Sequence, residues 1–236
     1  MQYRDLIPGR LGGRYIASHI RIPDGGPVAD YVHFHQVRFQ MIYCKKGWVR
    51  VVYEDQGEPF VLHAGDCVLQ PPAIRHRVLE ASPGLEVIEI SGPSEHETFR
   101  EHAITLPTEQ VDPRRRFGDQ RFVRHIAVEA NWRDAPEAGF EFRDTGISDA
   151  TDGMACARVL RAKRGSASTK GSPGKQFNQR PFLFLQVLEG SLELASDAVG
   201  THTLRAGDAC VIPNGSDYAI TAGQSCELLE VAVEQG

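Results

Sequence analysis

One pattern of turns and short apolar segments occurs twice along the chain, and this repeat constrains the fold more than any other feature. KKGWVRVVYE, which contains Gly47, matches LEGSLELAS around Gly190, 143 residues later. HAGDCVLQPPAIRHRV around Gly65 matches RAGDACVIPNGSDYAI around Gly207, 142 residues later. An earlier pair of similar segments begins at residues 3 and 142, an offset of 139. Three matches in the same order with nearly constant offset predict two copies of one structural unit.

The repeated segments have the composition of β-strands. They are short, rich in Val, Ile and aromatic residues, and separated by Gly and Pro. Such a series predicts an all-β protein made of antiparallel sandwiches or barrels. We predict a first barrel at residues 1–92, a connector at residues 93–140 and a second barrel at residues 141–236. The connector is too long for a plain loop, so part of it is expected to pack on the barrels. Within it, Ser94 and Glu97 form a capping-box pattern that predicts a helix over SEHETFREHA.

The composition excludes several classes of function. A formal net charge of −5 over 236 residues argues against nucleic acid as a partner. The N-terminal residues lack the apolar core of a signal peptide, and no segment reaches the roughly 18 apolar residues of a membrane span. We therefore expect a cytoplasmic protein with no membrane partner; a homodimer is left open. The five cysteines are scattered without a CxxC pair, which favours reduced thiols over disulfides or a thiolate metal site.

Two histidines one residue apart begin one of the strand-like segments. His33 and His35 are expected on one face, because side chains two apart in a strand point the same way. Gln40 lies five residues beyond His35. That odd step reaches the same interior only if a bulge or bend resets the alternation. A third histidine, His76, begins a later strand after a proline-containing bend.

The same alternation predicts which neighbours share the interior with these residues. If Gln40 faces inward, Ile42 and Cys44 should also line the pocket. On the later strand, Val78 shares the face of His76.

These residues resemble the two motifs of the cupin superfamily. The first motif is commonly written G(X)5HXH(X)3-4E(X)6G, and this chain has HFH, four residues, Gln40, six residues and Gly47. The second is G(X)5PXG(X)2H(X)3N, and this chain has Gly65, five residues, Pro71 and then His76 at the motif spacing. Glutamine replaces the glutamate of the first motif, and Ala73, Glu80 and an early Gly26 are further departures. The resemblance covers most of the chain as a bicupin, apart from the connector.

The resemblance implies two small barrels of the double-stranded β-helix type, joined by a partly helical connector. It also implies one divalent transition metal, Mn, Fe, Ni, Cu or Zn, inside the first barrel. Carried over by position, its ligands would be His33, His35, Gln40 and His76. Three imidazoles buried without a metal or a hydrogen-bond network would be costly, so a metal is favoured over a metal-free polar pocket.

The glutamine at position 40 affects the reactivity of a bound metal more than it affects whether a metal binds. A neutral amide leaves the full charge of a divalent ion uncompensated, which favours an anionic substrate and strong polarisation of a bound oxygen. Glutamine is also unable to act as a general base, so proton transfer would need another group.

In the second copy the equivalent positions carry different residues. The offsets place Gln176, Asn178, Leu183 and Tyr218 at the four candidate ligand positions. We therefore expect a second barrel without a metal, with a structural role or a small polar pocket.

The favoured hypothesis is a metal-dependent enzyme that acts on a small oxygen-rich or anionic organic molecule, most simply a dioxygenase-like oxidoreductase. A non-redox lyase or isomerase is the first alternative, because cupin folds host unrelated activities. A non-catalytic small-molecule binding or sensor module is the second. No catalytic residue beyond the metal ligands is assigned from the sequence.

Overall fold

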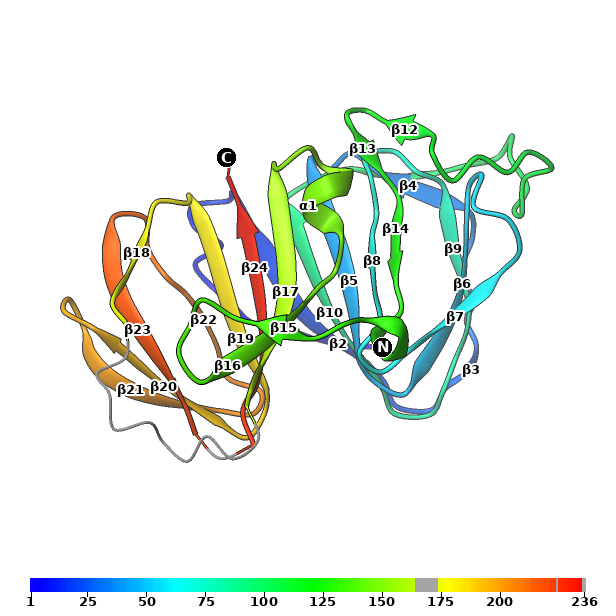
Figure 1. The fold of residues 1–236 in the computed structure, drawn as a ribbon. Helices are drawn as coiled ribbons and strands as arrows, with labels where there is room; N and C mark the ends of the chain where they lie inside the picture. The colour runs from blue at the N-terminus through cyan, green and yellow to red at the C-terminus, as the bar shows by residue number, and fades with distance from the viewer. Residues whose placement is uncertain (164–173, 224, 235–236) are drawn as a thin grey trace. The chain divides into compact units, whose positions relative to one another are not determined.

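The computed structural model describes residues 1–163, 174–223 and 225–234, which form two compact units (Figure 1). The first unit comprises residues 1–129 with residues 150–152, and the second comprises residues 130–149 with residues 153–236. Each unit is built from antiparallel β-sheets. The predicted all-β class and the predicted pair of barrels are therefore confirmed.

The first barrel is made of two six-stranded sheets. One runs in the order β1-β2-β10-β5-β8-β14 and contains β1 (Gln2–Asp5), β2 (Ile16–Ile22), β5 (Phe39–Lys46), β8 (Cys67–Leu69), β10 (Leu85–Gly92) and β14 (Val123–His125). The other runs in the order β11-β4-β9-β6-β7 with β3 beside β9, and contains β3 (Gly26–Pro27), β4 (His33–His35), β6 (Trp48–Tyr53), β7 (Phe60–His63), β9 (His76–Ala81) and β11 (Thr98–Arg100). The remaining elements of this unit are the ribbon of β12 (Arg116–Phe117) and β13 (Gln120–Arg121) and the 3-10 helix η1 (Ala127–Glu129).

The second barrel repeats this arrangement. Its larger sheet has the order β15-β16-β17-β24-β19-β22 and contains β15 (Arg133–Asp134), β16 (Phe140–Asp144), β17 (Ala155–Ala162), β19 (Phe182–Glu189), β22 (Ala209–Val211) and β24 (Glu227–Val233). Its smaller sheet has the order β18-β23-β20-β21 and contains β18 (Gln176–Asn178), β20 (Ser191–Ser196), β21 (Gly200–Arg205) and β23 (Ser216–Ala222). One short helix, α1 (Ile147–Ala150), follows β16. The order β4-β9-β6-β7 thus corresponds to β18-β23-β20-β21, so the sequence repeat is a repeat of structure.

Alternation along the strands builds the interior of the first barrel. On β6, Val49, Val51 and Tyr53 are all at most 5% exposed and belong to one apolar cluster, whereas Arg50 between them is exposed. Leu62 on β7 and Leu85 on β10 join that cluster from the two sheets. Burial of these side chains stabilises the barrel by about 1.5–3 kcal/mol each.

The hairpin between β5 and β6 requires the glycine that both motif copies contain. Gly47 has a φ of +77°, and a Cβ atom there would lie 2.3 Å from the Ser82 hydroxyl oxygen. That hydroxyl accepts a hydrogen bond from the Trp48 amide at 2.9 Å. Gly190 has a φ of +70° at the equivalent turn.

The helix predicted after Pro93 is wrong. The segment instead contributes β11, which pairs antiparallel with β4 so that Thr98 lies opposite His35 and Arg100 opposite His33. The Ser94 hydroxyl donates to the Gly13 carbonyl at 2.8 Å instead of capping a helix. A helix cap is worth about 1 kcal/mol, which pairing along an open strand edge outweighs. The helical part of the predicted connector is η1.

Later connector residues also pack on the first barrel. β14 extends the larger sheet by pairing with β8. Arg115 Nη1 lies 2.9 Å from Glu54 Oε1 and 2.7 Å from Asp55 Oδ2, and both carboxylates are nearly buried. These contacts explain why residues up to Glu129 belong to the first unit.

Ala73 provides a test of backbone strain beside the second motif. Its φ is +59°, whereas the equivalent residue of the second barrel, Gly215, has a φ of +77°. A left-handed conformation costs a residue with a Cβ about 1–2 kcal/mol. The greater freedom of glycine in the unfolded chain offsets about 0.4–1 kcal/mol of that strain. We expect Ala73→Gly to raise the free energy of unfolding by about 0.5–1 kcal/mol, measured by urea denaturation.

Gly215→Ala is the matched reverse substitution. A Cβ at Gly215 meets nothing within 4 Å, so strain alone should lower the stability by a similar amount. A loss in Ala73→Gly or a gain in Gly215→Ala would contradict this account.

Candidate metal centre

Three imidazoles meet inside the first barrel. β4 carries His33 and His35, and β9 pairs with β4 so that His76 lies directly opposite His33. The ring centroids are 4.3 Å apart for His33 and His76, 5.1 Å for His33 and His35, and 5.2 Å for His35 and His76. One ligand nitrogen from each ring lies within 4.8 Å of the other two. Within residues 1–163, 174–223 and 225–234, these are the residues that form a group of three or more candidate metal donors.

Each ring makes a hydrogen bond through Nδ1, and for His33 and His76 this bond fixes the tautomer. His33 Nδ1 lies 2.8 Å from the Tyr31 carbonyl oxygen, and His76 Nδ1 lies 3.1 Å from the Ile74 carbonyl oxygen. A carbonyl oxygen only accepts, so both Nδ1 atoms donate and both Nε2 atoms are acceptors that carry a lone pair. His35 Nδ1 lies 2.8 Å from the Thr98 hydroxyl. Such outer partners orient the rings, and at His33 and His76 they also hold the tautomer that a metal-binding imidazole needs.

The protein environment keeps two of these rings neutral. Burial, with the neighbouring His33 and His96, lowers the pKa of His35 to about 4. Burial, with His33 and His35, lowers the pKa of His76 well below its usual value, against a small opposing effect of the Ile74 carbonyl. Metal binding requires deprotonated imidazole, so these side chains are already in the required state at neutral pH.

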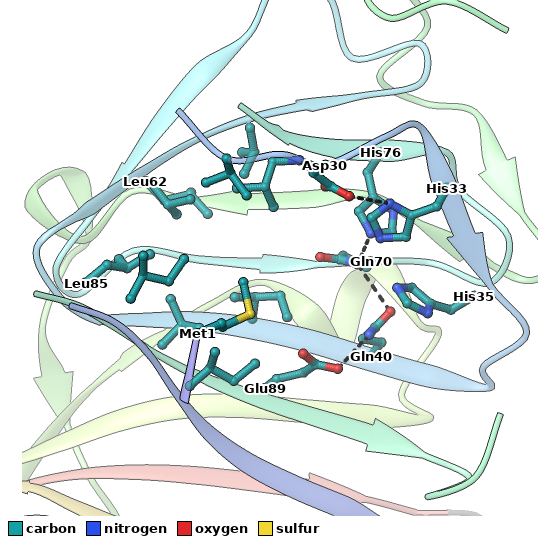
Figure 2. A pocket seen from close by; sticks show the side chains of 18 of the residues that line it. Met1, Asp30, His33, His35, Gln40, Leu62, Gln70, His76, Leu85 and Glu89 are labelled. Atoms are coloured by element: carbon teal, nitrogen blue, oxygen red, sulfur yellow. Dashed lines mark hydrogen bonds and ion pairs between the residues drawn. The ribbon is translucent and has the colours of Figure 1, made fainter. Parts of the chain in front are cut away.

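Gln40 reaches the same interior from the opposite sheet. Residues 36–38 carry the chain from β4 to β5, and this change of sheet resets the alternation that the sequence leaves open. Gln40 is 2% exposed. Its Nε2 donates to Glu89 Oε1 at 3.0 Å, and its Oε1 accepts from Gln70 Nε2 at 3.2 Å (Figure 2). The amide oxygen is therefore turned away from Glu89.

Gln70 links the amide of Gln40 to the histidines. Its Nε2 lies 3.3 Å from His76 Nε2, and its Oε1 accepts a hydrogen bond from the buried Tyr53 hydroxyl at 2.9 Å. Burial, with a smaller contribution from Glu89, raises the pKa of Tyr53, so its hydroxyl stays protonated and able to donate. A cation held by His76 Nε2 would take the place of the hydrogen bond from Gln70.

Two carboxylates flank the candidate ligands. Asp30 Oδ1 lies 3.4 Å from His33 Nδ1, while its Oδ2 accepts from the Val78 amide at 2.8 Å. Glu89, on β10, holds the Gln40 amide. Neither cupin motif specifies a residue type at the positions of Asp30, Glu89, Gln70 or Tyr53, so the motifs gave no reason to select these four residues.

A cavity of about 330 Å³ connects these groups. Its polar end contains His33, His35, His76 and Gln40, and Figure 2 shows Leu62 and Leu85 at the other end. Its described lining includes Asp30, Gln70, Tyr53, Glu89, and the predicted pocket residues Ile42 and Val78.

Cys44 lies outside its predicted place, and a further histidine, His96, lies beside the three candidate ligands. Cys44 shares the inward face of β5, but it is absent from the described lining of the cavity and packs in the apolar cluster. Its sulfur lies 3.6 Å from the Gly47 carbonyl oxygen, at the hairpin end of the strand. His96 lies with its ring centroid 5.4 Å from that of His35, which its isolated position in the sequence gave no reason to expect.

In the second barrel the equivalent strands pair in the same register, but other side chains occupy the positions of the candidate ligands. Gln176 on β18 pairs with Tyr218 on β23, as His33 pairs with His76. The Tyr218 hydroxyl donates to Gln176 Oε1 at 2.9 Å. Asn178 Nδ2 donates to the Ile212 carbonyl at 2.8 Å, and Leu183 is packed in the core. These four side chains therefore form hydrogen bonds and apolar contacts where the first barrel has three imidazoles and the Gln40 amide.

Comparisons with known proteins agree with the fold. Residues 18–90 match the family described as Cupin domain. Salicylate 1,2-dioxygenase from Pseudaminobacter salicylatoxidans superposes with a TM-score of 0.67 at 15% identity, covering 94% of this chain and 71% of that chain. A variant of oxalate decarboxylase from Bacillus subtilis superposes with a TM-score of 0.66 at 13% identity, covering 99% and 72%. Among curated proteins, no sequence matches this chain. The predicted resemblance is confirmed, and at these identities the two structures share the fold alone.

The contact between Gln40 and Glu89 gives a test of the fourth ligand. Gln40→Glu places two carboxylates about 3.0 Å apart, so the metal-free variant should lose about 1–3 kcal/mol of stability. The same variant should bind a divalent ion more tightly than wild type, because a carboxylate is a stronger donor than an amide. Thermal unfolding in a chelator and titration calorimetry with Mn²⁺ measure the two effects.

The exchange variant Gln40→Glu/Glu89→Gln is the control. It restores an amide–carboxylate hydrogen bond with the roles reversed, so metal-free stability should recover while tighter metal binding remains. Unchanged metal affinity in Gln40→Glu would show that residue 40 is not a ligand.

Proposed function

We propose that this bicupin, whose cupin domain spans residues 18–90, is a metal-dependent enzyme acting on a small oxygen-rich or anionic organic molecule. The reaction is dioxygenase-like. The observation that carries the proposal is the convergence of three imidazole nitrogens, within 4.8 Å of one another, at one end of a 330 Å³ cavity.

The residues present fit a divalent transition metal. His33 and His76 carry lone pairs on Nε2, and the Nδ1 atoms of all three histidines are held by hydrogen bonds. Gln40 would supply the fourth donor through Oε1. This imidazole-rich set suits Mn, Fe, Ni, Cu or Zn. When bound, such an ion acts as a Lewis acid on a substrate oxygen and, if Mn, Fe, Ni or Cu, can also change its redox state.

The cavity would hold the substrate, and buried hydrogen bonds hold the candidate metal ligands in position. The cavity volume is at the low end of the roughly 300–1,000 Å³ typical of small-molecule sites, which supports a small substrate over a polymer. The buried Tyr53 and Gln70 hold Gln40 and His76 in place through their hydrogen bonds. The known structures that share the fold include a dioxygenase and a decarboxylase, so both redox and bond-cleaving chemistry occur on this architecture.

A non-redox lyase or isomerase is the second candidate, and Glu89 is the observation that favours it. Its carboxylate lines the cavity, and one of its oxygens accepts from Gln40 and from the Ser91 hydroxyl. A carboxylate in that wall can hold a proton removed from an enolisable substrate, a role that Gln40 is unable to fill. A non-catalytic binding module is the remaining alternative.

In the described part of the chain, no helix combines the length and apolar character needed to span a membrane.

Metal content tests the proposal directly. Protein purified without added metal and then loaded with Mn²⁺ or Fe²⁺ should retain about one equivalent per chain after desalting, as expected for a single site. His76→Ala should lose most of this metal, whereas His202→Ala should retain it, because His202 is exposed on β21 of the second barrel. A wild-type protein that binds none of the five metals would refute the proposal.

Oxygen consumption separates the candidate reactions. The loaded enzyme should take up oxygen with at least one compound in a panel of diketones, catechols and hydroxybenzoates. Product formation without oxygen uptake would instead assign a lyase or isomerase. Thermal stabilisation by a compound that is never turned over would favour the binding module.

A further inference from the structure

Much of the cavity lies beyond the reach of the candidate metal ligands and has apolar walls. Its described lining contains, from strands of both sheets, the apolar side chains Ile20, Ile22, Val49, Leu62, Leu85 and Val87. Leu62 is 1% exposed and Leu85 is 2% exposed, so this end lies deep between the sheets. Figure 2 shows both on the side of the cavity opposite His33 and His35.

These walls give a polar ligand nothing to bind. Aliphatic side chains neither donate nor accept hydrogen bonds, so polar groups placed against them would lose their hydration without compensation. Water there would also lack the two to four polar partners that a buried water needs. The walls therefore suit an apolar group of the ligand.

The charged groups at the polar end of the cavity limit the charge of the part of the ligand that binds there. Asp30 is within 3.4 Å of His33, and Glu89 holds Gln40, so two carboxylates lie beside the candidate ligands. Together they offset the charge of a divalent ion at short range. Glu89 also lines the cavity, where it repels a second negative charge on the ligand.

The cavity also has a route to the surface. Met1 and Tyr3 line it while 63% and 67% exposed, respectively. A ligand can therefore enter past these residues.

We propose that the ligand of this site is amphipathic: a chelating oxygen head group with at most one negative charge, joined to an apolar aliphatic or aromatic body. The head binds at the three histidines and the body lies between Val49, Leu62 and Leu85. This inference rests on the proposed metal-dependent function and specifies its substrate class.

A series of chelators with growing tails tests the inference. Acetohydroxamic, butanohydroxamic and hexanohydroxamic acids share one metal-binding head and differ in methylene count. With Zn²⁺-loaded protein, calorimetric affinity should rise about fourfold per methylene until the cavity is filled, since each buried CH₂ contributes about 0.8 kcal/mol. Equal affinities along the series would overturn the inference.

The same titrations keep this inference separate from the proposed function. Acetohydroxamic acid that binds the loaded protein, with no gain from longer tails, would leave the metal site standing and reject the apolar body. Protein that binds neither Zn²⁺ nor any other of the proposed metals would reject both.

Val49→Thr and Val61→Thr form a matched pair of variants. Val49 lines the cavity, whereas Val61, adjacent to Leu62 on β7, alternates to the other face of the strand and is not among the described lining residues. A hydroxyl in the cavity wall should weaken hexanohydroxamic acid binding about fivefold or more and leave acetohydroxamic acid within about twofold. Val61→Thr should change neither affinity.

Thermal unfolding of both variants verifies that they fold. Equal losses for both probes in Val49→Thr, or the same loss in Val61→Thr, would contradict the predicted position of the tail.

Discussion

The pairing of β4 with β9 is the contact on which the candidate site depends. It places His33 opposite His76, two residues that are 43 positions apart in the sequence. β11 pairs with the other edge of β4 and brings the Thr98 hydroxyl to His35. β4 is only three residues long, so these two neighbours hold it in register. Because side chains alternate along a strand, a shift of β4 by one residue would turn His33 and His35 away from the interior.

The structure changes the electrostatic picture that Gln40 alone suggests. The carboxylate that is missing at position 40 is present on the adjacent strand, where Glu89 accepts a hydrogen bond from the Gln40 amide. Negative charge therefore remains near the site, but one hydrogen bond farther from the centre. Since the energy of interaction between charges falls with distance, a bound ion would keep more of its electrophilic character than one ligated by a carboxylate. Asp30 likewise places a carboxylate near the site without being a candidate ligand, on the side of His33.

The sequence predicted the elements whose signals are local or repeated. Alternating apolar residues and glycine turns indicated the strands, and the constant offset indicated two barrels. The prediction of a helix in the connector was wrong because the capping pattern at Ser94 reports only a local preference. Pairing with the edge of β4 is a tertiary contact that this pattern does not reveal. Gln70 and Glu89 escaped notice for a similar reason. Each acquires its role from a residue on another strand, and no spacing within one segment reports such contacts.

The register shared by the two barrels separates architecture from chemistry. The pair Gln176 and Tyr218 occupies the same strand positions as His33 and His76, and it makes a side-chain hydrogen bond where the first barrel presents nitrogen lone pairs. The same backbone frame therefore brings together two histidines in one barrel and Gln176 with Tyr218 in the other. The second barrel shows which contacts form at these strand positions when the residues are not histidines: a hydrogen bond between the Tyr218 hydroxyl and Gln176. The two copies therefore differ at the candidate ligand positions in their side chains and agree in the pairing of the strands that carry them.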